Sequence, residues 1–401
     1  MTTIATGFTA NIDLLTKVSP EFYDEIRGFA GGEPKSVINT WDEFCTVIDW
    51  NIQRGSGAEY IVANPDILSR LEKKLNWSKS IGGTGLQAAC AASCAGYLAL
   101  VNIPIQTNEL EELVSGHKGL VLLSDREGDV PKHFILEYEY GNSSNRIIFR
   151  KEDEFPAEII TNTFIERLAN HQDGIKWLLI SGYNAFDRSE DIDLFLENTV
   201  NILTALGHNR PKVHLELASI WSLDEQWKII RTLGSYVDSI GINEDEYQEL
   251  LGGSEPLLGY DDEELLERVN TACELLGVAH FILHTKQFSL IKSDQYDTSE
   301  WRDSLTNGNL FAFSRATKGR FCDRETMQQV SLQATLHPRG ETLRNLTKDR
   351  KDLTIIPAFE GEIVSTIGLG DTFTAGLLVE APFKFLPLES TTLLNNDGLK
   401  I

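Results

Sequence analysis

Residues 212–243 read KVHLELASIWSLDEQWKIIRTLGSYVDSIGIN and contain a unit that recurs along the chain. The two ends of this stretch, 212–219 and 237–243, are mainly apolar, as expected for buried strands. Between them, DEQWKIIRTLG has apolar residues at helical spacing. A strand, a helix and a second strand in this order predict a parallel β-α-β unit.

The same alternation extends in both directions from this unit. Further strands are expected at 3–13 (TIATGFTANID), 175–182 and 280–288, and further helices at 41–53, 65–75, 191–206 and 262–277. The stretch 79–100 is interpreted as a strand end, a glycine turn and a long helix, with the strand GLVLLS following. Repeated strand and helix pairs predict a mostly parallel sheet with helices on both faces.

One segment departs from this rhythm. Residues 133–150 (HFILEYEYGNSSNRIIFR) alternate apolar and polar side chains on both sides of a Gly-Asn-Ser-Ser turn. This pattern predicts a β-hairpin with one face available to cover a site. Arg146, on the second strand, is either a surface charge or a residue that neutralises phosphate when the hairpin closes.

Composition limits the partners of the chain. Its 401 residues include 36 Lys and Arg against 60 Asp and Glu, which gives a net charge of −24 and disfavours nucleic acid and anionic membranes as partners. The first residues, MTTIATGFTANIDLL, show no signal-peptide pattern, and we expect a cytoplasmic protein. The longest apolar stretch, 86–105, is interrupted by Asn102 and Pro104, which favours a buried helix over a membrane span.

Polar residues gather where the predicted strands end. In open α/β sheets, ligands bind at the carboxyl ends of the strands, so these tips are candidates for one shared crevice. The candidates are Asn11, Asp13, Gly82, Gly83, His214, Glu216, residues 243–246, His284 and residues 368–371.

The stretch STIGLGDTFTAG, residues 365–376, has the strongest chemical signal. Gly368 and Gly370 let the backbone approach a ligand, and the first N–H groups of the following helix form a site for a phosphoryl group. A carboxylate at Asp371 would repel a bound phosphate, but it suits a base that takes the proton of an attacking hydroxyl. The alternative is that Asp371 only caps the helix.

Two further pairs suit a divalent cation. Asn243 and Glu246 are three residues apart at a predicted helix start, and His214 and Glu216 share one face of a strand. Their oxygens suit hydrated Mg²⁺. The alternatives are an acidic capping turn for the first pair and a hydrogen-bonded histidine beside an ion-paired glutamate for the second.

Asn11 and Asp13 are separated by one residue and therefore project to the same side of the first strand. Together they offer hydrogen-bond donors and acceptors to vicinal hydroxyl groups. The alternative is an Asx turn that closes the strand. For His284, the residues alone favour a wall position or a backbone hydrogen bond.

Taken in order along the chain, these motifs resemble the ADP-dependent sugar kinases of the ribokinase-like superfamily, the glucokinase and phosphofructokinase family. STIGLGDTFTAG is similar to the superfamily's Gly-x-Gly-Asp motif, GINEDE to its Asn-x-x-Glu motif, and HLELAS to the His-x-Glu motif of the ADP-using branch. TANID, IGGTGLQAA and SNRIIF resemble the sugar-binding strand, the double-glycine turn and the lid. The resemblance runs from residue 6 to about residue 380.

The resemblance implies a fold, a reaction and a set of roles. The implied fold is a ribokinase-like three-layer α/β sandwich with a central, mostly parallel sheet and a smaller β-rich lid. We expect a large nucleotide-binding domain from 1–13, 45–118 and 170–401, and a lid from 14–44 and 119–169. The implied reaction transfers the β-phosphoryl group of ADP to a hydroxyl of a sugar or sugar phosphate, with Mg²⁺ as cofactor.

By matching position, the implied roles fall into four groups. Asp371 is the base, with Gly368, Leu369 and Gly370 as the anion hole; Asn11, Asp13, Gly82, Gly83 and Arg146 receive the sugar; Asn243, His284, Ile356 and Pro357 contact the nucleotide; Glu216 and Glu246 organise the metal.

One departure from the family pattern concerns the acceptor. Thr84 and Gly85 follow the double glycine where the family usually has an amide-bearing run such as Gln-Ala-Gly, so the acceptor stays open among glucose, fructose 6-phosphate and a pentose or nucleoside. The alternative functions are an ATP-dependent ribokinase-like kinase and a non-catalytic nucleotide or sugar sensor.

Overall fold

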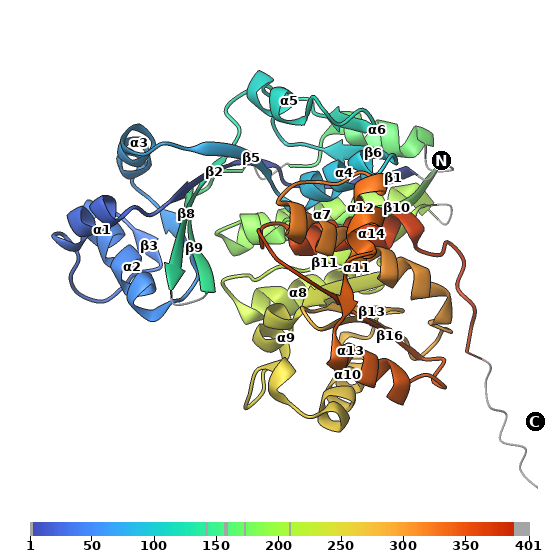
Figure 1. The fold of residues 1–401 in the computed structure, drawn as a ribbon. Helices are drawn as coiled ribbons and strands as arrows, with labels where there is room; N and C mark the ends of the chain where they lie inside the picture. The colour runs from blue at the N-terminus through green and yellow to red at the C-terminus, as the bar shows by residue number, and fades with distance from the viewer. Residues whose placement is uncertain (1–2, 141–142, 156–158, 172–173, 208–209, 389–401) are drawn as a thin grey trace, which may run out of the picture.

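The computed structural model describes residues 3–140, 143–155, 159–171, 174–207 and 210–388. Within these residues the chain forms two main sheets of different size. Figure 1 shows the smaller sheet, with helices α1 to α3, standing to one side of the larger sheet.

The larger sheet has nine strands in the described residues. Their spatial order is β16 (Leu353–Pro357), β14 (Phe288–Lys292), β13 (Phe281–His284), β12 (Ser239–Asn243), β11 (Lys212–Glu216), β10 (Ile175–Ile180), β1 (Thr3–Thr6), β6 (Leu98–Asn102) and β7 (Leu120–Leu123). Neighbours from β13 to β7 are parallel, and β14 runs antiparallel to β13 and β16. The predicted mostly parallel sheet is confirmed.

Helices cover both faces of this sheet, because its strands are apolar on both sides. In β10, Trp177 and Leu179 belong to one core, whereas Leu178 and Ile180 belong to a second. The first core includes α4 (Thr84–Cys94), α11 (Arg302–Lys318) and α14 (Leu369–Glu380). The second includes α6 (Asn162–His171), α7 (Ser189–Leu206), α8 (Leu223–Leu233), α9 (Glu244–Leu251) and α10 (Asp262–Leu276).

The smaller sheet carries the predicted hairpin. Its strand order is β3 (Val37–Ile38), β4 (Ala58–Val62), β9 (Ser143–Lys151), β8 (Lys132–Tyr140), β2 (Asn11–Lys17) and β5 (Ser78–Gly82). β8 and β9 pair antiparallel, as the alternation at 133–150 predicts. We call this sheet, with α1 (Pro20–Arg27), α2 (Trp41–Arg54) and α3 (Pro65–Lys74), the lid.

The remaining elements are short connections at the periphery. They are the helices α5 (Asn108–Val114), α12 (Arg324–Ser331) and α13 (Pro338–Leu346), the strands β15 (Thr335–Leu336) and β17 (Phe359–Glu360), and the 3₁₀ turns Tyr183–Ala185, Leu257–Gly259 and Ser299–Trp301.

The stretch 3–13 forms two strands, where the sequence predicted one. Thr3–Thr6 lies in the larger sheet, whereas Asn11–Lys17 begins the lid and pairs with β5 and β8. The apolar, β-branched pattern continues through both strands, so it does not mark the crossing between the sheets. Asn11 and Asp13 therefore stand where the chain enters the lid.

The sheet pairings also differ from the expected domain boundaries. β4 and β5, expected in the large domain, belong to the lid sheet, because β4 pairs with β9 and β5 with β2. β7, expected in the lid, pairs with β6 of the larger sheet. Strand partners across long sequence separations are not visible in local periodicity, which is why the boundaries at 45 and 119 are wrong.

The long helix expected in 79–100 is shorter than predicted. α4 ends at Cys94, Gly96 turns the chain with a φ of +87°, and β6 begins at Leu98. The apolar stretch is thus a helix and a strand, both largely buried. Among the described residues, no helix has the length and apolarity needed to cross a membrane.

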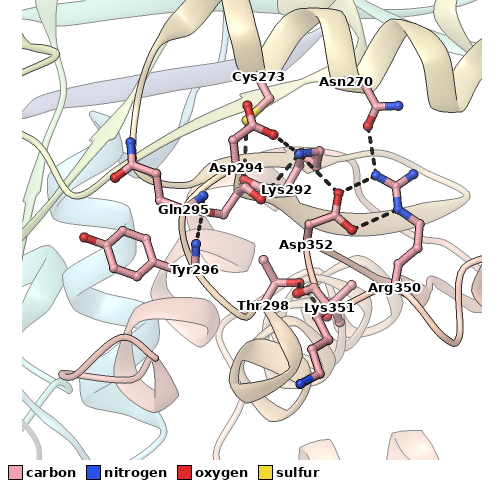
Figure 2. Close-up of polar contacts among 12 residues, drawn as sticks. Asn270, Cys273, Lys292, Asp294, Gln295, Tyr296, Thr298, Arg350, Lys351 and Asp352 are labelled. Atoms are coloured by element: carbon pink, nitrogen blue, oxygen red, sulfur yellow. Dashed lines mark hydrogen bonds and ion pairs between the residues drawn. The ribbon is translucent and has the colours of Figure 1, made fainter. Parts of the chain in front are cut away.

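An ion-pair group joins β14 to the edge strand β16 (Figure 2). Lys292, only 3% exposed, contacts Asp294 and Asp352, and Arg350 donates to Asp352 at 3.0 and 2.6 Å. Arg350 also reaches Asn270 of α10 at 3.0 Å. These contacts hold the start of β16 in register beside the end of β14.

Candidate active site

The predicted glycine turn leads directly into α14. Gly368 caps the helix with a φ of +64°, and a Cβ at this position would lie 2.1 Å from the side-chain oxygen of Gln87. The first intrahelical donor is the N–H of Thr372, which bonds the Gly368 carbonyl at 3.1 Å. The N–H groups of Leu369, Gly370 and Asp371 precede it and stay available to a ligand. The turn therefore has the geometry of an anion site.

A cleft of about 230 Å³ lies between this turn and the lid. We call it the central cleft. Its walls include the predicted residues Asn11, Asp13, Gly83, Arg146, Gly368 and Asp371, and also Glu59, Thr84, Gln87, His133, Arg150, Glu154 and Asn184. Residues from distant parts of the chain thus meet in one space. Of the expected strand tips, those at Asn11, Asp13, Gly83, Gly368 and Asp371 line it, whereas those after β11, β12 and β13 do not.

Asp371 lines the central cleft, and its carboxyl group has a raised pKa. Burial raises its pKa to about 6, and the charges of Glu216 and Asp13 act in the same direction. The Thr84 hydroxyl and the Arg315 guanidinium oppose this rise in pKa. A carboxyl group with a pKa near the working pH is suited to accept a proton from a substrate hydroxyl.

Asn11 and Asp13 form the predicted polar pair at the start of β2. The Asn11 amide donates to the Asp13 carboxylate at 2.6 Å, and burial raises the pKa of Asp13. Gly82 pairs with Asn11 across β2 and β5, and a Cβ there would collide with both side chains. Gly82 thus leaves room for this pair and does not line the central cleft, unlike Gly83.

Two charged pairs in the central cleft were missed by the sequence analysis. His133 lies 2.6 Å from Glu154. Burial opposes its protonation, but Glu154, Asp13 and Glu59 together raise the pKa of His133 to about 9. Arg150 binds Asp187 through two hydrogen bonds of 3.1 and 2.5 Å. A signal was present, because residues an even number apart on a strand share a face, and Arg150 follows Arg146 by four residues.

Glu216, predicted as a metal residue, is held by two histidines. His214 contacts one carboxylate oxygen and His284 the other, both at 2.8 Å. Burial alone would raise the pKa of Glu216, but the two histidines lower it to about 2. The structure therefore has the alternative arrangement, in which Glu216 is ion-paired beside a histidine. His284 takes part in it as a second side-chain partner of Glu216 and does more than line a wall.

Asn243 and Glu246 form the capping box that was the alternative for this pair. The Asn243 side chain accepts the N–H of Glu246 at 2.9 Å, and the Glu246 carboxylate accepts the N–H of Asn243 at 2.9 Å. Burial, and then the charge of Glu216, raise the pKa of Glu246 to about 8. The buried Glu216 and the half-buried Glu246 thus lie close enough to repel each other, and a cation between them would relieve this repulsion.

Several predicted residues do not line the central cleft. Glu216, Asn243, Glu246 and His284 are absent from its walls. A second hollow of about 660 Å³ shares Arg146 and Ile148 with the cleft and is bounded by Asp245, Gln248 and Glu249 of α9. Ile356 and Pro357 end β16 at the sheet edge, and Asn309 donates to the Pro357 carbonyl at 3.0 Å.

Comparison with known proteins identifies the same group of kinases across the whole fold. Residues 2–380 match the family model described as the ADP-specific phosphofructokinase/glucokinase conserved region. The chain is 26% identical to an ADP-specific phosphofructokinase of Pyrococcus abyssi, over 69% of this chain and 63% of that protein. It is 23% identical to the ADP-dependent glucose/glucosamine kinase of the same organism, over 92% and 89%.

A solved structure supports the fold assignment. The phosphofructokinase from Pyrococcus horikoshii with AMP superposes with a TM-score of 0.75 at 21% identity, covering 94% of this chain and 97% of that one. The predicted α/β fold, with a large, mostly parallel sheet between helices and a smaller lid sheet, is confirmed. The matches to the first three curated phosphofructokinases span 63%, 50% and 50% of those proteins.

Proposed function

The chain belongs to the ADP-specific phosphofructokinase/glucokinase family, and from this premise we propose that it transfers the β-phosphoryl group of ADP to a sugar hydroxyl and releases AMP. The observation that carries the proposal is the position of Asp371. Its carboxyl group faces the same cleft as the Asn11 and Asp13 pair and stands at the start of a helix with free N–H groups.

The proposed reaction follows from these positions. Asn11 and Asp13 bind hydroxyl groups of the acceptor, and Asp371 takes the proton of the attacking hydroxyl. The acceptor oxygen forms a bond to the β-phosphorus while the bond from that phosphorus to the bridging oxygen breaks, so AMP leaves with the bridging oxygen. The N–H groups at the start of α14 stabilise the charge on the transferring group. Arg146 faces the same space from the lid.

Mg²⁺ fits the residues beyond the central cleft. Glu246, with its pKa raised to about 8, and Glu216 form an acidic pair that a hydrated cation would stabilise. Within the described ranges, no group of three or more His, Cys, Asp or Glu side chains forms a cage for a metal. Mg²⁺ that keeps its waters and the donor phosphates needs only one or two protein oxygens, and it would neutralise charge on the diphosphate.

The charges of the central cleft favour an uncharged sugar over a sugar phosphate. Its cationic side chains are His133, Arg146 and Arg150. His133 is already paired with Glu154, and Arg150 is already paired with Asp187. A phosphate ester needs cations that are not already paired. We therefore propose a hexose such as glucose as the preferred acceptor.

The test is AMP release from ADP, measured with a panel of glucose, glucosamine, fructose 6-phosphate, pentoses and nucleosides. We expect AMP release that depends on the acceptor, with the highest kcat/KM for an unphosphorylated hexose. ADP formed from ATP at a higher rate than AMP from ADP would support the ATP-dependent alternative, and ADP binding without any turnover would support a sensor. A higher kcat/KM for fructose 6-phosphate than for glucose would refute only the acceptor assignment.

A further inference from the structure

Arg315 is a buried cation directly behind the anion-binding turn. It lies on α11, and only 7% of the residue is exposed. Its Nε donates to the carbonyl of Ile367 at 3.3 Å, and its Nη2 donates to the side-chain oxygen of Gln87 at 3.3 Å. The guanidinium stacks 3.8 Å from the centre of the Phe321 ring. Both hydrogen-bond acceptors are uncharged, although burying a cation is unfavourable unless an anion compensates.

The contact with Ile367 fixes the orientation of the turn. The carbonyl that Arg315 holds belongs to the peptide between Ile367 and Gly368, and this peptide is trans. In a trans peptide the C=O and the N–H point in opposite directions. The Gly368 N–H therefore points away from Arg315, and Gly368 lines the central cleft.

The second contact fixes the other side of the same turn. Gln87 lines the central cleft, and its side-chain oxygen lies so close to Gly368 that a Cβ there would stand 2.1 Å from it. Arg315 thus links α4 to the start of α14 through one planar group. A guanidinium suits this task because its fork of donors reaches two acceptors at fixed angles.

Arg315 also opposes the acidic groups around Asp371. The acidic groups are Asp13 on β2 and Glu216 on β11. The Thr84 side chain on α4 hydrogen-bonds the Asp371 carboxyl group, and His284 on β13 lies beside Gly370. The positive charge of Arg315 lowers the pKa of Asp371, against the larger effect of burial. Burial lowers the pKa of Arg315 itself, and the nearby Asp371 counteracts this.

We propose that Arg315 is a positioning residue for phosphoryl transfer. It turns the Gly368 N–H toward the cleft and supplies the buried positive charge that faces Asp371. The proposal rests on the proposed function for its effect on turnover, but the position of the peptide and the charge beside Asp371 can be tested without turnover.

The test compares Arg315→Met, Arg315→Lys and the control Arg324→Met. Arg324 also donates to a backbone carbonyl, that of Ala95 at 2.9 Å, and lies over the ring of Tyr97 at 4.6 Å, but it does not line the central cleft. The Asp371 carboxyl is titrated by ¹³C NMR in aspartate-labelled protein, with Asp371→Asn identifying its resonance. ADP affinity is measured by calorimetry on the same proteins.

The two halves of the proposal give separate expectations. In Arg315→Met the Asp371 titration moves to higher pH by roughly one unit, and ADP binds more weakly. Arg315→Lys keeps the charge but not the fork, so it restores the titration and leaves ADP binding weak. Arg324→Met changes neither. If the Met variant does not fold, Arg315→Gln carries the same titration expectation.

Other outcomes separate this proposal from the proposed function. An unchanged Asp371 titration in a folded Arg315→Met variant overturns the assigned charge, even if activity falls. ADP affinity equal to that of the wild type overturns the assigned orientation of the peptide. A wild-type protein that releases no AMP with any acceptor refutes the proposed function, yet the carboxyl titration still decides the role of Arg315.

Discussion

Asp371 combines burial with neighbouring charges of both signs, and this combination determines its chemistry. An isolated aspartate is ionised at neutral pH and is a weak base. Burial brings its pKa to about 6, which strengthens the base while most of the group remains ionised at pH 7. The helix-cap alternative does not account for this pKa, since a carboxylate that accepts hydrogen bonds at a helix start has a lowered one.

Asp371→Asn should abolish most turnover without loss of nucleotide binding. The amide keeps the shape but cannot accept the proton, so we expect kcat to fall by roughly 10²–10⁴ while the Kd for ADP changes little. In the wild type, kcat/KM should rise with pH through about 6, because the base must be deprotonated. Steady-state rates from pH 5 to 9 check both; an undiminished kcat in the variant contradicts the assignment.

Glu246→Gln should raise the Mg²⁺ requirement. The carboxyl has a pKa near 8 because it is buried beside Glu216, and a cation nearby would favour its ionised form. Without this charge we expect the Mg²⁺ concentration for half-maximal rate to increase about tenfold. Glu244→Gln, in the same helical turn, is the control. Equal Mg²⁺ titrations for wild type and Glu246→Gln would remove Glu246 from the metal site.

Among the elements, the start of α14 depends most on a single residue. Gly368 has a φ of +64°, and a side chain there would meet Gln87. Gly277 has nearly the same φ, +63°, at the end of α10, but nothing lies within 4 Å of its Cβ position. A substitution at Gly277 therefore tests the backbone strain alone, whereas the same substitution at Gly368 adds a collision with Gln87.

Gly277→Ala should cost about 1–2 kcal/mol in the free energy of unfolding, from left-handed strain alone, with kcat unchanged. Gly368→Ala should carry the same strain and displace Gln87 or the turn, so kcat should also fall by roughly 10² or more. Urea denaturation and AMP release measure the two effects. Similar activity in the two variants would show that the turn does not need its close approach to Gln87.

The elements also show what the sequence could predict. The hairpin at 133–150 and the strand tips of the larger sheet followed from periodicity, and Asn11, Asp13, Gly83, Arg146, Gly368 and Asp371 do line one cleft. His133 and Arg315 could not be assigned in this way. The role of His133 is evident only from its contact with Glu154. The role of Arg315 is evident only from its hydrogen bond to a turn more than fifty residues away in the sequence. Such pairings arise from tertiary structure, which local patterns do not contain.

At the scale of the whole molecule, the lid is built from segments that the sequence divided wrongly. Its strands come from residues 11–17, 37–38, 58–62, 78–82, 132–140 and 143–151, with strands of the larger sheet between them in the sequence. The lid and the larger domain are joined by a buried ion pair. Arg150 on β9 binds Asp187, which follows β10, and the two side chains are 6% and 7% exposed.

Breaking this pair should destabilise the molecule more than removing a surface charge. Arg150→Met leaves the Asp187 carboxylate buried without its partner, so we expect the free energy of unfolding to fall by about 3–5 kcal/mol. The double variant Arg150→Met with Asp187→Leu should recover part of this loss, since no charge stays buried. Arg188→Met is the control, because Arg188 is 60% exposed and solvent screens its pairing with Asp191, so we expect little change in the free energy of unfolding.

Urea denaturation of the four proteins measures these differences, and the KM for the sugar reports on the lid. If the ion pair holds the lid over the central cleft, Arg150→Met raises this KM and the double variant does not restore it, because packing replaces the charge but not the hydrogen bonds that fix β9. An unfolding free energy equal to that of Arg188→Met would mean that solvent reaches Asp187, and the lid would then be attached mainly by the chain crossings and the apolar core.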